Sequence, residues 1–147
     1  MIAYSLGIDP GKSGALVLLD PLGAVVWARR MPVIARPVAK GWQRHLPAAE
    51  LRKLPKTAPD YDQVGIRDAL RDAADRGRVV ATLENPGLIR IGGKAMVTAS
   101  GSLKSCVGLI EGVCAGLGIE VRKVAPATWQ AAMSVRGNSD EIGRAHV

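Results

Sequence analysis

The segment LGIDPGKSG (residues 6–14) joins two short apolar runs and places one acidic side chain between them. Asp9 ends the first run, and a glycine-rich turn leads directly into the second, which begins at Ala15. A lone carboxylate is costly to bury, so Asp9 is unsuited to fill a core. A carboxylate at a strand end beside a tight turn is well placed to hold a hard cation. We therefore expect two adjacent strands with a candidate metal ligand between them; the alternative is a carboxylate that only caps the turn.

The same pattern of apolar runs predicts three strands in the first thirty residues, over 3–9, 14–20 and 24–30. A strong turn signal, Asp20-Pro21-Leu22-Gly23, separates the last two. Consecutive strands joined by short turns predict an antiparallel meander. The next stretch, residues 31–59, is rich in proline and basic residues and shows no clear period. We interpret it as an irregular loop insertion with a short helix near residues 48–54.

Strand and helix patterns alternate after this insertion. They predict a helix from an N-cap at Asp60 to a stop at Gly77, followed by a strand over 78–84. A Gly- and Ser-rich loop over 88–102 is expected next, and then a helix from 103 to 118. A strand over 119–124 and a helix from 126 to about 133 complete the order. This order predicts an α/β fold with a mixed sheet and helices on its faces. Right-handed crossovers place the strand that ends in Glu84 beside the first strand. Asp9 and Glu84 are then expected at the same edge of the sheet.

Two carboxylates on adjacent strand ends can share divalent metal ions. Two Mg²⁺ ions about 4 Å apart can activate a water and stabilise the leaving oxygen in phosphodiester hydrolysis. A strand-end salt bridge is the alternative role for Glu84. The glycines of the first turn resemble a nucleotide-binding P-loop, but that motif has four residues between its glycines and a helix after it. Here three residues separate Gly7 from Gly11 and a strand is predicted to follow, so we exclude a P-loop.

Length and composition fit one domain of 147 residues with a buried core. No apolar run reaches the roughly 18 residues of a membrane span, and no secretory signal is recognisable at the N-terminus. If Cys106 and Cys114 share a helix, they lie about 12 Å apart, which is too far for a disulfide. Reduced thiols predict a cytoplasmic protein. The chain has two histidines and no Cys-x-x-Cys, which disfavours zinc.

The formal net charge is +7, and basic residues are concentrated between Arg29 and Lys56. Such a block is a plausible footprint for a nucleic-acid backbone, although a solvated basic loop is the alternative. Trp42 lies within the block and can either stack on a base or pack in a partly buried position. The candidate DNA-binding residues are Lys12, Ser13, Arg36, Lys40, Arg44, Arg90 and Lys94.

Four motifs together resemble the RuvC-like Holliday junction resolvases of phages and bacteria. They are Leu6-Gly7-Ile8-Asp9-Pro10-Gly11, the strand ending in Glu84, Gly108-Leu109-Ile110-Glu111-Gly112-Val113 and Val124-Ala125-Pro126-Ala127-Thr128-Trp129. The resemblance implies a ribonuclease H-like fold and a homodimeric endonuclease that cuts four-way DNA junctions with Mg²⁺ or Mn²⁺ held by four acidic residues. It makes Asp9 the first metal ligand and Glu84 the second. Glu111 matches no catalytic position, so a structural or surface role is expected.

The family's last two acids belong to a final helix, and no such helix is recognisable in this sequence. Asp140 is the only late acid before the last seven residues, Glu141-Ile142-Gly143-Arg144-Ala145-His146-Val147. The common sequencing adapter AGATCGGAAGAGCACACGTC, preceded by one G, translates to these seven residues. We therefore expect a single domain over 1–140 and an adapter-derived tail over 141–147. A domain that lacks the final helix is expected to be weakly active or inactive.

Three functions remain open from the sequence. The first is a metal-dependent, structure-selective DNA endonuclease that acts on Holliday junctions. The second is a non-catalytic junction- or nucleic-acid-binding module on the same fold. The third is a fragment of an actin-like ATPase or sugar kinase, because the Asp-x-Gly turn between strands resembles the first phosphate loop of that class; the chain is short for that two-lobed fold.

Overall fold

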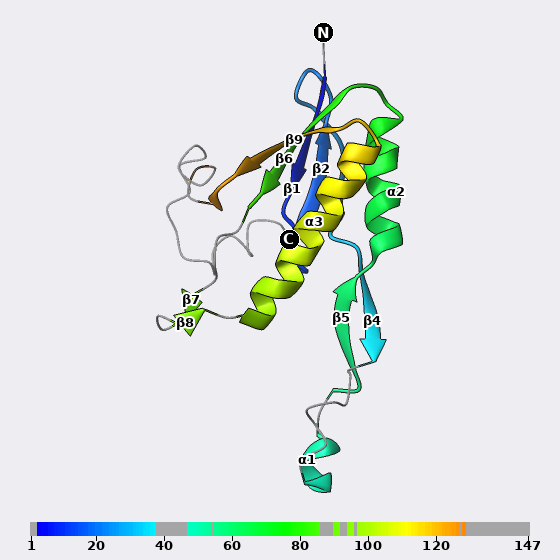
Figure 1. The fold of residues 1–147 in the computed structure, drawn as a ribbon. Coiled ribbons are helices and arrows are strands. Elements are labelled where there is room, and N and C mark those ends of the chain that lie inside the picture. The colour runs from blue at the N-terminus through cyan, green and yellow to red at the C-terminus, as the bar shows by residue number, and fades with distance from the viewer. Residues whose placement is uncertain are drawn as a thin grey trace.

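The structure is a computed structural model that describes residues 3–37, 47–53, 55–85, 90–91, 94–95, 97–126 and 128. Its centre is a five-stranded mixed sheet with the strand order β3-β2-β1-β6-β9 (Figure 1). The strands are β1 (Tyr4–Ile8), β2 (Ala15–Leu19), β3 (Val25–Arg30), β6 (Val79–Glu84) and β9 (Glu120–Val124). The pairs β1–β2 and β2–β3 are antiparallel, whereas β1–β6 and β6–β9 are parallel. This arrangement confirms the predicted meander with two added parallel strands.

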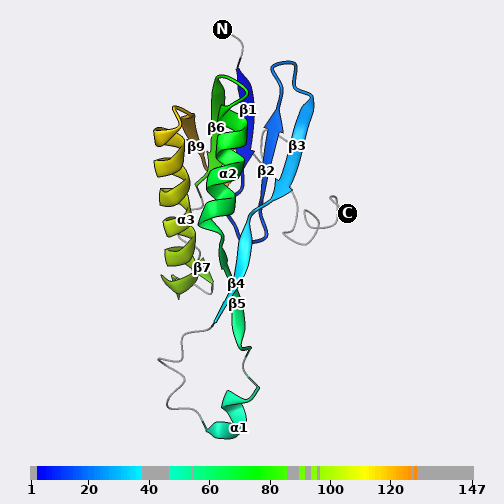
Figure 2. The same cartoon turned by 90° about the vertical axis from the view of Figure 1, so that its right-hand side faces the viewer.

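Two helices, α2 (Gln63–Ala74) and α3 (Val97–Gly116), cover one face of the sheet (Figures 1 and 2). Strand residues alternate between the two faces, so every second side chain points to these helices. Leu6 and Ile8 of β1 are therefore buried, as are Leu16 and Leu18 of β2. They form one core cluster with buried residues of both helices, which include Ile66, Leu70, Ile110 and Cys114. The opposite face of β1 carries the exposed residues Ser5 and Gly7.

The start of α2 differs from the sequence prediction. The N-cap is Asp62, whose Oδ1 accepts a hydrogen bond of 3.0 Å from the Gly65 amide. Asp60, the predicted cap, lies instead in β5 (Thr57–Tyr61), opposite Ile34 of the neighbouring strand. Asp60 and Asp62 are both suitable helix caps. Because Asp60 is paired within the β4–β5 hairpin, the helix begins after Asp62.

The basic insertion is partly regular, which corrects its interpretation as an irregular loop. Its ends form an antiparallel hairpin of β4 (Val33–Pro37) and β5, and α1 (Ala48–Leu51) confirms a short helix in between. The hairpin extends away from the sheet, with α1 at its far end (Figure 2). We call the described residues of this segment, 33–37, 47–53 and 55–61, the arm.

The second half of the chain follows the predicted alternation with two differences. A small hairpin of β7 (Arg90–Ile91) and β8 (Lys94–Ala95) occupies part of the expected loop, and α3 begins at Val97, before the predicted start. Gly118 follows α3 with a φ of +70°, a conformation that suits glycine at a helix end. The helix predicted over 126–133 falls mostly outside the described residues.

Both cysteines lie in α3, buried and as free thiols, as expected. Burial raises the pKa of Cys114 from 9.0 to about 11, with a smaller contribution from the charge of Glu111. Burial also raises the pKa of Cys106 to about 11, against the opposing effect of a hydrogen bond with Tyr61.

These thiols predict a loss of stability at alkaline pH. Between pH 9 and 11 the unfolded thiols have released their protons while the folded thiols retain theirs. The free energy of unfolding is therefore expected to be independent of the thiols below pH 9 and to fall as pH rises toward 11. Urea unfolding across this range measures the effect. Cys114→Ala should make the pH dependence shallower, and an unchanged dependence in that variant would contradict the assignment.

Candidate metal centre and nucleic-acid interface

The parallel pairing of β1 and β6 brings Asp9 and Glu84 to neighbouring positions. Ile8 pairs with Leu83 in the strand register, so Asp9 and Glu84 are the next residues along the two strands. Paired strands lie about 4.8 Å apart. Ile8 and Leu83 are both buried under the helices, and alternation places the following two residues toward the opposite face. Asp9 is exposed and Glu84 half-buried, in agreement with that placement.

The turn after β1 holds the Asp9 carboxylate in a defined position. Asp9 Oδ1 accepts a hydrogen bond of 3.0 Å from the Gly11 amide. The backbone is closed by a bond of 2.9 Å from the Asp9 amide to the Ala15 carbonyl and one of 2.8 Å from the Gly14 amide to the Gly11 carbonyl. Asp9 therefore does cap its own turn, but only one carboxylate oxygen is used for this. Oδ2 accepts no hydrogen bond from the residues that the structure describes.

Gly14 is required for this turn because Asp9 packs directly against it. A Cβ atom at Gly14 would lie 2.7 Å from Asp9 Cγ and closer still to the Asp9 carbonyl oxygen. A strand, β2, begins immediately after Gly14, which confirms that the segment is not a P-loop.

The donor set at this edge fits a hard cation in kind. Two carboxylates with oxygen donors match the preference of Mg²⁺ for few carboxylates and several water or phosphate ligands. Within the described ranges, no cluster of three or more His, Cys, Asp or Glu side chains is found. The third and fourth acids that the resemblance implies for the family have no counterpart in those ranges, and Asp140 lies outside the described residues.

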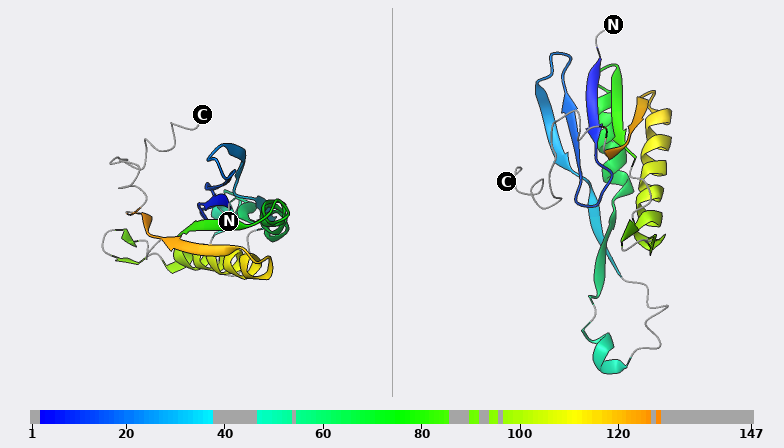
Figure 3. Two further views of the ribbon diagram at one scale, coloured as in Figure 1. Left: turned by 90° about the horizontal axis from the view of Figure 1, so that it is seen from above. Right: turned by 90° about the vertical axis from the view of Figure 1, so that its left-hand side faces the viewer.

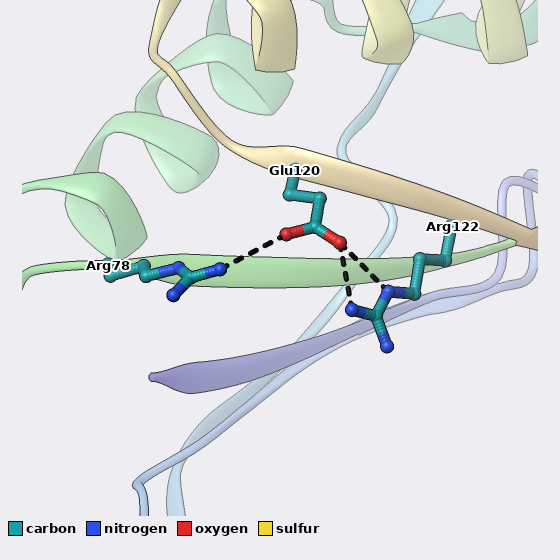
Figure 4. Close-up of polar contacts among 3 residues, drawn as sticks. All are labelled: Arg78, Glu120 and Arg122. Carbon is teal, nitrogen blue, oxygen red and sulfur yellow. Dashed lines mark hydrogen bonds and ion pairs between the residues drawn. The ribbon is translucent and has the colours of Figure 1, made fainter. Parts of the chain in front are cut away.

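Two other acids have structural partners elsewhere. Glu111 on α3 forms an ion pair of 2.7 Å with Lys123 of β9, which agrees with the expected surface role. Glu120 begins β9, at the opposite end of the strands from Asp9 and Glu84. Its carboxylate lies between Arg122 and Arg78 (Figure 4), at 2.8 Å and 3.4 Å. The hydrogen bonds and charge of Arg122, and then of Arg78, lower the pKa of Glu120.

The arm is joined to the turn that carries Asp9. Lys12 Nζ donates a hydrogen bond of 2.8 Å to the Pro59 carbonyl and lies 5.5 Å from the centroid of the Tyr61 ring. The Tyr61 hydroxyl donates a buried bond of 2.9 Å to the Pro10 carbonyl. Lys12 thus holds the base of the arm, whereas Ser13 is exposed on the turn. Their predicted contact with DNA stays a prediction.

Tyr61 is the residue that the sequence analysis missed. It is 8% exposed, and burial, with the nearby Cys106 and Asp9, raises its pKa to about 12. The hydroxyl is therefore protonated at neutral pH and remains a donor to Pro10. A Tyr directly before the helix cap, in a chain with only two tyrosines, was the available sequence signal.

Removing this hydroxyl is expected to destabilise the fold. Tyr61→Phe leaves the buried Pro10 carbonyl without its donor, which should lower the free energy of unfolding by about 1–3 kcal/mol. Tyr4→Phe is the matched control, because the Tyr4 hydroxyl has no hydrogen bond within the described part of the chain. Urea unfolding of the two variants measures the difference. Equal stabilities would show that the bond to Pro10 contributes little.

The remaining predicted DNA contacts are spread over both hairpins. Arg36 lies on β4, where its Nε is 3.0 Å from Asp60 Oδ2 in an exposed ion pair. Arg90 and Lys94 lie in β7 and β8. Both hairpins lie toward the carboxyl ends of β1 and β6 (Figures 1 and 3). Lys40, Arg44 and Trp42 fall outside the described residues.

Comparisons with known proteins give a structural match only. No protein-family model and no curated protein sequence matches the chain. Among solved structures, Thermus thermophilus RuvC in complex with a Holliday junction substrate matches with a TM-score of 0.56 and 14% identity, over 90% of this chain and 71% of that one. A second Thermus thermophilus RuvC structure matches with a TM-score of 0.48 and 16% identity, over 95% of this chain and 75% of that one. The chain therefore has the mixed α/β, ribonuclease H-like fold of RuvC.

Among the described residues, no helix has the length and apolar character needed to cross a membrane.

Proposed function

We propose that this chain is a metal-dependent, structure-selective DNA endonuclease of the Holliday junction resolvase type, acting as a homodimer on branched DNA. The observation that carries the proposal is the position of Asp9 and Glu84, which directly follow the paired residues Ile8 and Leu83 of two parallel strands in a RuvC-like fold. The solved relative is bound to a Holliday junction, which supports branched DNA as the substrate class.

Asp9 and Glu84 are the residues that would hold the metal, which would be Mg²⁺ or Mn²⁺. The full site would hold two ions. Bound there, the ions would supply Lewis-acid activation of the scissile phosphate and of the attacking water. The Gly11 amide would orient the Asp9 carboxylate through its bond to Oδ1, and Oδ2 accepts no hydrogen bond from the described residues. Basic residues of the two hairpins would neutralise phosphates of the bound DNA.

Cleavage of a labelled four-way junction tests the proposal directly. We expect product with Mg²⁺ or Mn²⁺, none with a chelator, and little from a linear duplex of the same sequence. This result is expected of the complete product of the source gene, and the present chain, expected to be weakly active or inactive, is assayed beside it. Metal-independent cleavage, or equal cleavage of the linear duplex, would overturn the proposal. Sedimentation of the free protein tests the dimer.

A non-catalytic junction-binding module is the second candidate. It is favoured by the presence of only two carboxylates at this sheet edge within the described residues. A complete gene product that binds junctions in a salt-dependent manner, but cuts none with either metal, would select it.

A further inference from the structure

The arm has no core of its own. All of β4 is exposed, as are Thr57, Ala58 and Pro59 of β5, and the two strands pair only with each other among the described residues. An isolated two-stranded hairpin is marginally stable in water. Its base, however, is fixed to the domain through Lys12 and Tyr61. The arm is thus a narrow ribbon held at one end.

The charge of the arm selects the kind of partner. Residues 33–61 contain six Lys or Arg and two acids, Glu50 and Asp60. Asp60 is paired with Arg36, whereas the exposed side chains of Arg52, Lys53 and Lys56 have no ionic partner within the described part of the arm. This unbalanced positive charge is complementary to a polyphosphate backbone.

The shape of the arm favours duplex over single-stranded DNA. A two-stranded ribbon fits the major groove of B-DNA, where apolar side chains such as the exposed Val33 and Ile34 can contact thymine methyl groups. Single-strand binding relies on aromatic side chains that stack on bases. Tyr61 is buried at the base and bonded to Pro10, so it cannot stack on a base. Trp42 lies outside the described residues, and binding to a single-stranded oligonucleotide tests its stacking directly.

We propose that the arm is a duplex-binding ribbon, which enters the major groove of a DNA arm flanking the junction and is fixed by Lys12 and Tyr61 to the turn that carries Asp9. This inference rests on the proposed action on branched DNA. Each five-residue strand spans about 16 Å, and a duplex rises about 3.4 Å per base pair. The ribbon therefore covers about five base pairs beyond the site.

Binding to junctions with long and short duplex arms tests the ribbon without requiring cleavage. Affinity is measured by fluorescence anisotropy in a chelator, over a range of salt, for the unmodified chain and for R52Q/K53Q/K56Q. The matched control R67Q/R71Q/R76Q removes three positive charges from exposed residues of α2 and of the turn that follows it. The net charge of both variants therefore falls from +7 to +4.

We expect the unmodified chain and the α2 control to bind long-armed junctions at least about tenfold more tightly than short-armed ones. The arm variant should lose this gain, and its salt dependence on long arms should fall by about 2 to 3 in log–log slope, about 0.9 per phosphate contact. Its affinity for short-armed junctions should be unchanged.

Three results would overturn the proposed ribbon. The arm variant could keep the full gain in affinity for long-armed junctions, or the α2 control could lose that gain to the same extent. The arm variant could also lose as much affinity for a single-stranded oligonucleotide as for the long-armed junction. The binding assay contains no divalent metal, so a failure to cleave junctions is a separate result. It would reject the proposed endonuclease and leave the ribbon to be judged by binding alone.

Discussion

Asp9→Asn is expected to abolish Mg²⁺-dependent junction cleavage while junction binding is retained. Asparagine keeps an oxygen that can accept the Gly11 amide, so the turn should persist. It removes the negative charge that would hold the cation. Substitutions of groups that only support metal ligands already cost 10–100-fold, so loss of a ligand should reduce the cleavage rate by at least about 100-fold. The rate is measured under single-turnover conditions, and Mn²⁺ binding to this chain is measured in parallel by electron paramagnetic resonance.

Asp20→Asn is the control for this variant. Asp20 also caps a turn, because its Oδ1 accepts hydrogen bonds of 2.8 Å from the amides of Leu22 and Ala24. It follows β2, which runs antiparallel to β1, and therefore lies at the opposite end of the sheet. Asp20→Asn should retain both cleavage and Mn²⁺ binding. If the two variants behaved alike, the role of Asp9 would be confined to its turn.

Gly14→Ala is expected to cause the largest structural defect. The added methyl group would overlap the carbonyl and carboxyl groups of Asp9. Gly14 cannot move away easily, because its amide donates to Gly11 and its carbonyl accepts from Met31. Overpacking of this kind costs about 1–3 kcal/mol and occasionally more. For a chain of this size, Tm should fall by about 2–4 °C per kcal/mol, and the displaced carboxylate should bind Mn²⁺ more weakly.

Gly7→Ala is the matched control, since the nearest atom to its added methyl would be the Val17 carbonyl oxygen at an ordinary 3.9 Å. Gly7 lies in β1, the strand that Asp9 directly follows, and its replacement should change neither Tm nor Mn²⁺ binding appreciably. Thermal unfolding by circular dichroism compares the two. A Gly14→Ala protein as stable as Gly7→Ala would show that the Asp9 turn adapts without cost.

The sheet could be predicted from the sequence because each of its strands has its own apolar signal. Alternation in β1 and β2, the turn at Asp20 and the strand–helix order after α2 together specify both the meander and the parallel pair. The adjacency of Asp9 and Glu84 followed from the handedness of the crossover. The register of Ile8 with Leu83 confirms that adjacency, while the metal itself stays a prediction.

The arm could not be predicted because it lacks the signal that identifies strands. Its residues are exposed, so no alternation of buried and exposed side chains is imposed on them, and Pro37 and Pro59 within its strands argue against strands at all. The wrong choice of Asp60 as helix cap has the same origin. Only the pairing of Asp60 with Ile34, invisible in the sequence, shows that β5 continues to Tyr61. Tyr61 was missed because its partner, Pro10, is remote in the chain.

The charged strand β9 has a consequence for how copies of this protein behave in concentrated solution. It pairs only with β6 among the described residues, so its outer backbone groups could template a strand from another molecule. Glu120, Arg122 and Lys123 line this strand. Glu120 forms ion pairs with Arg122 of the same strand and with Arg78, and Lys123 pairs with Glu111 of α3. A second strand docking there would have to desolvate these charged side chains. These charged side chains thus oppose edge-to-edge aggregation.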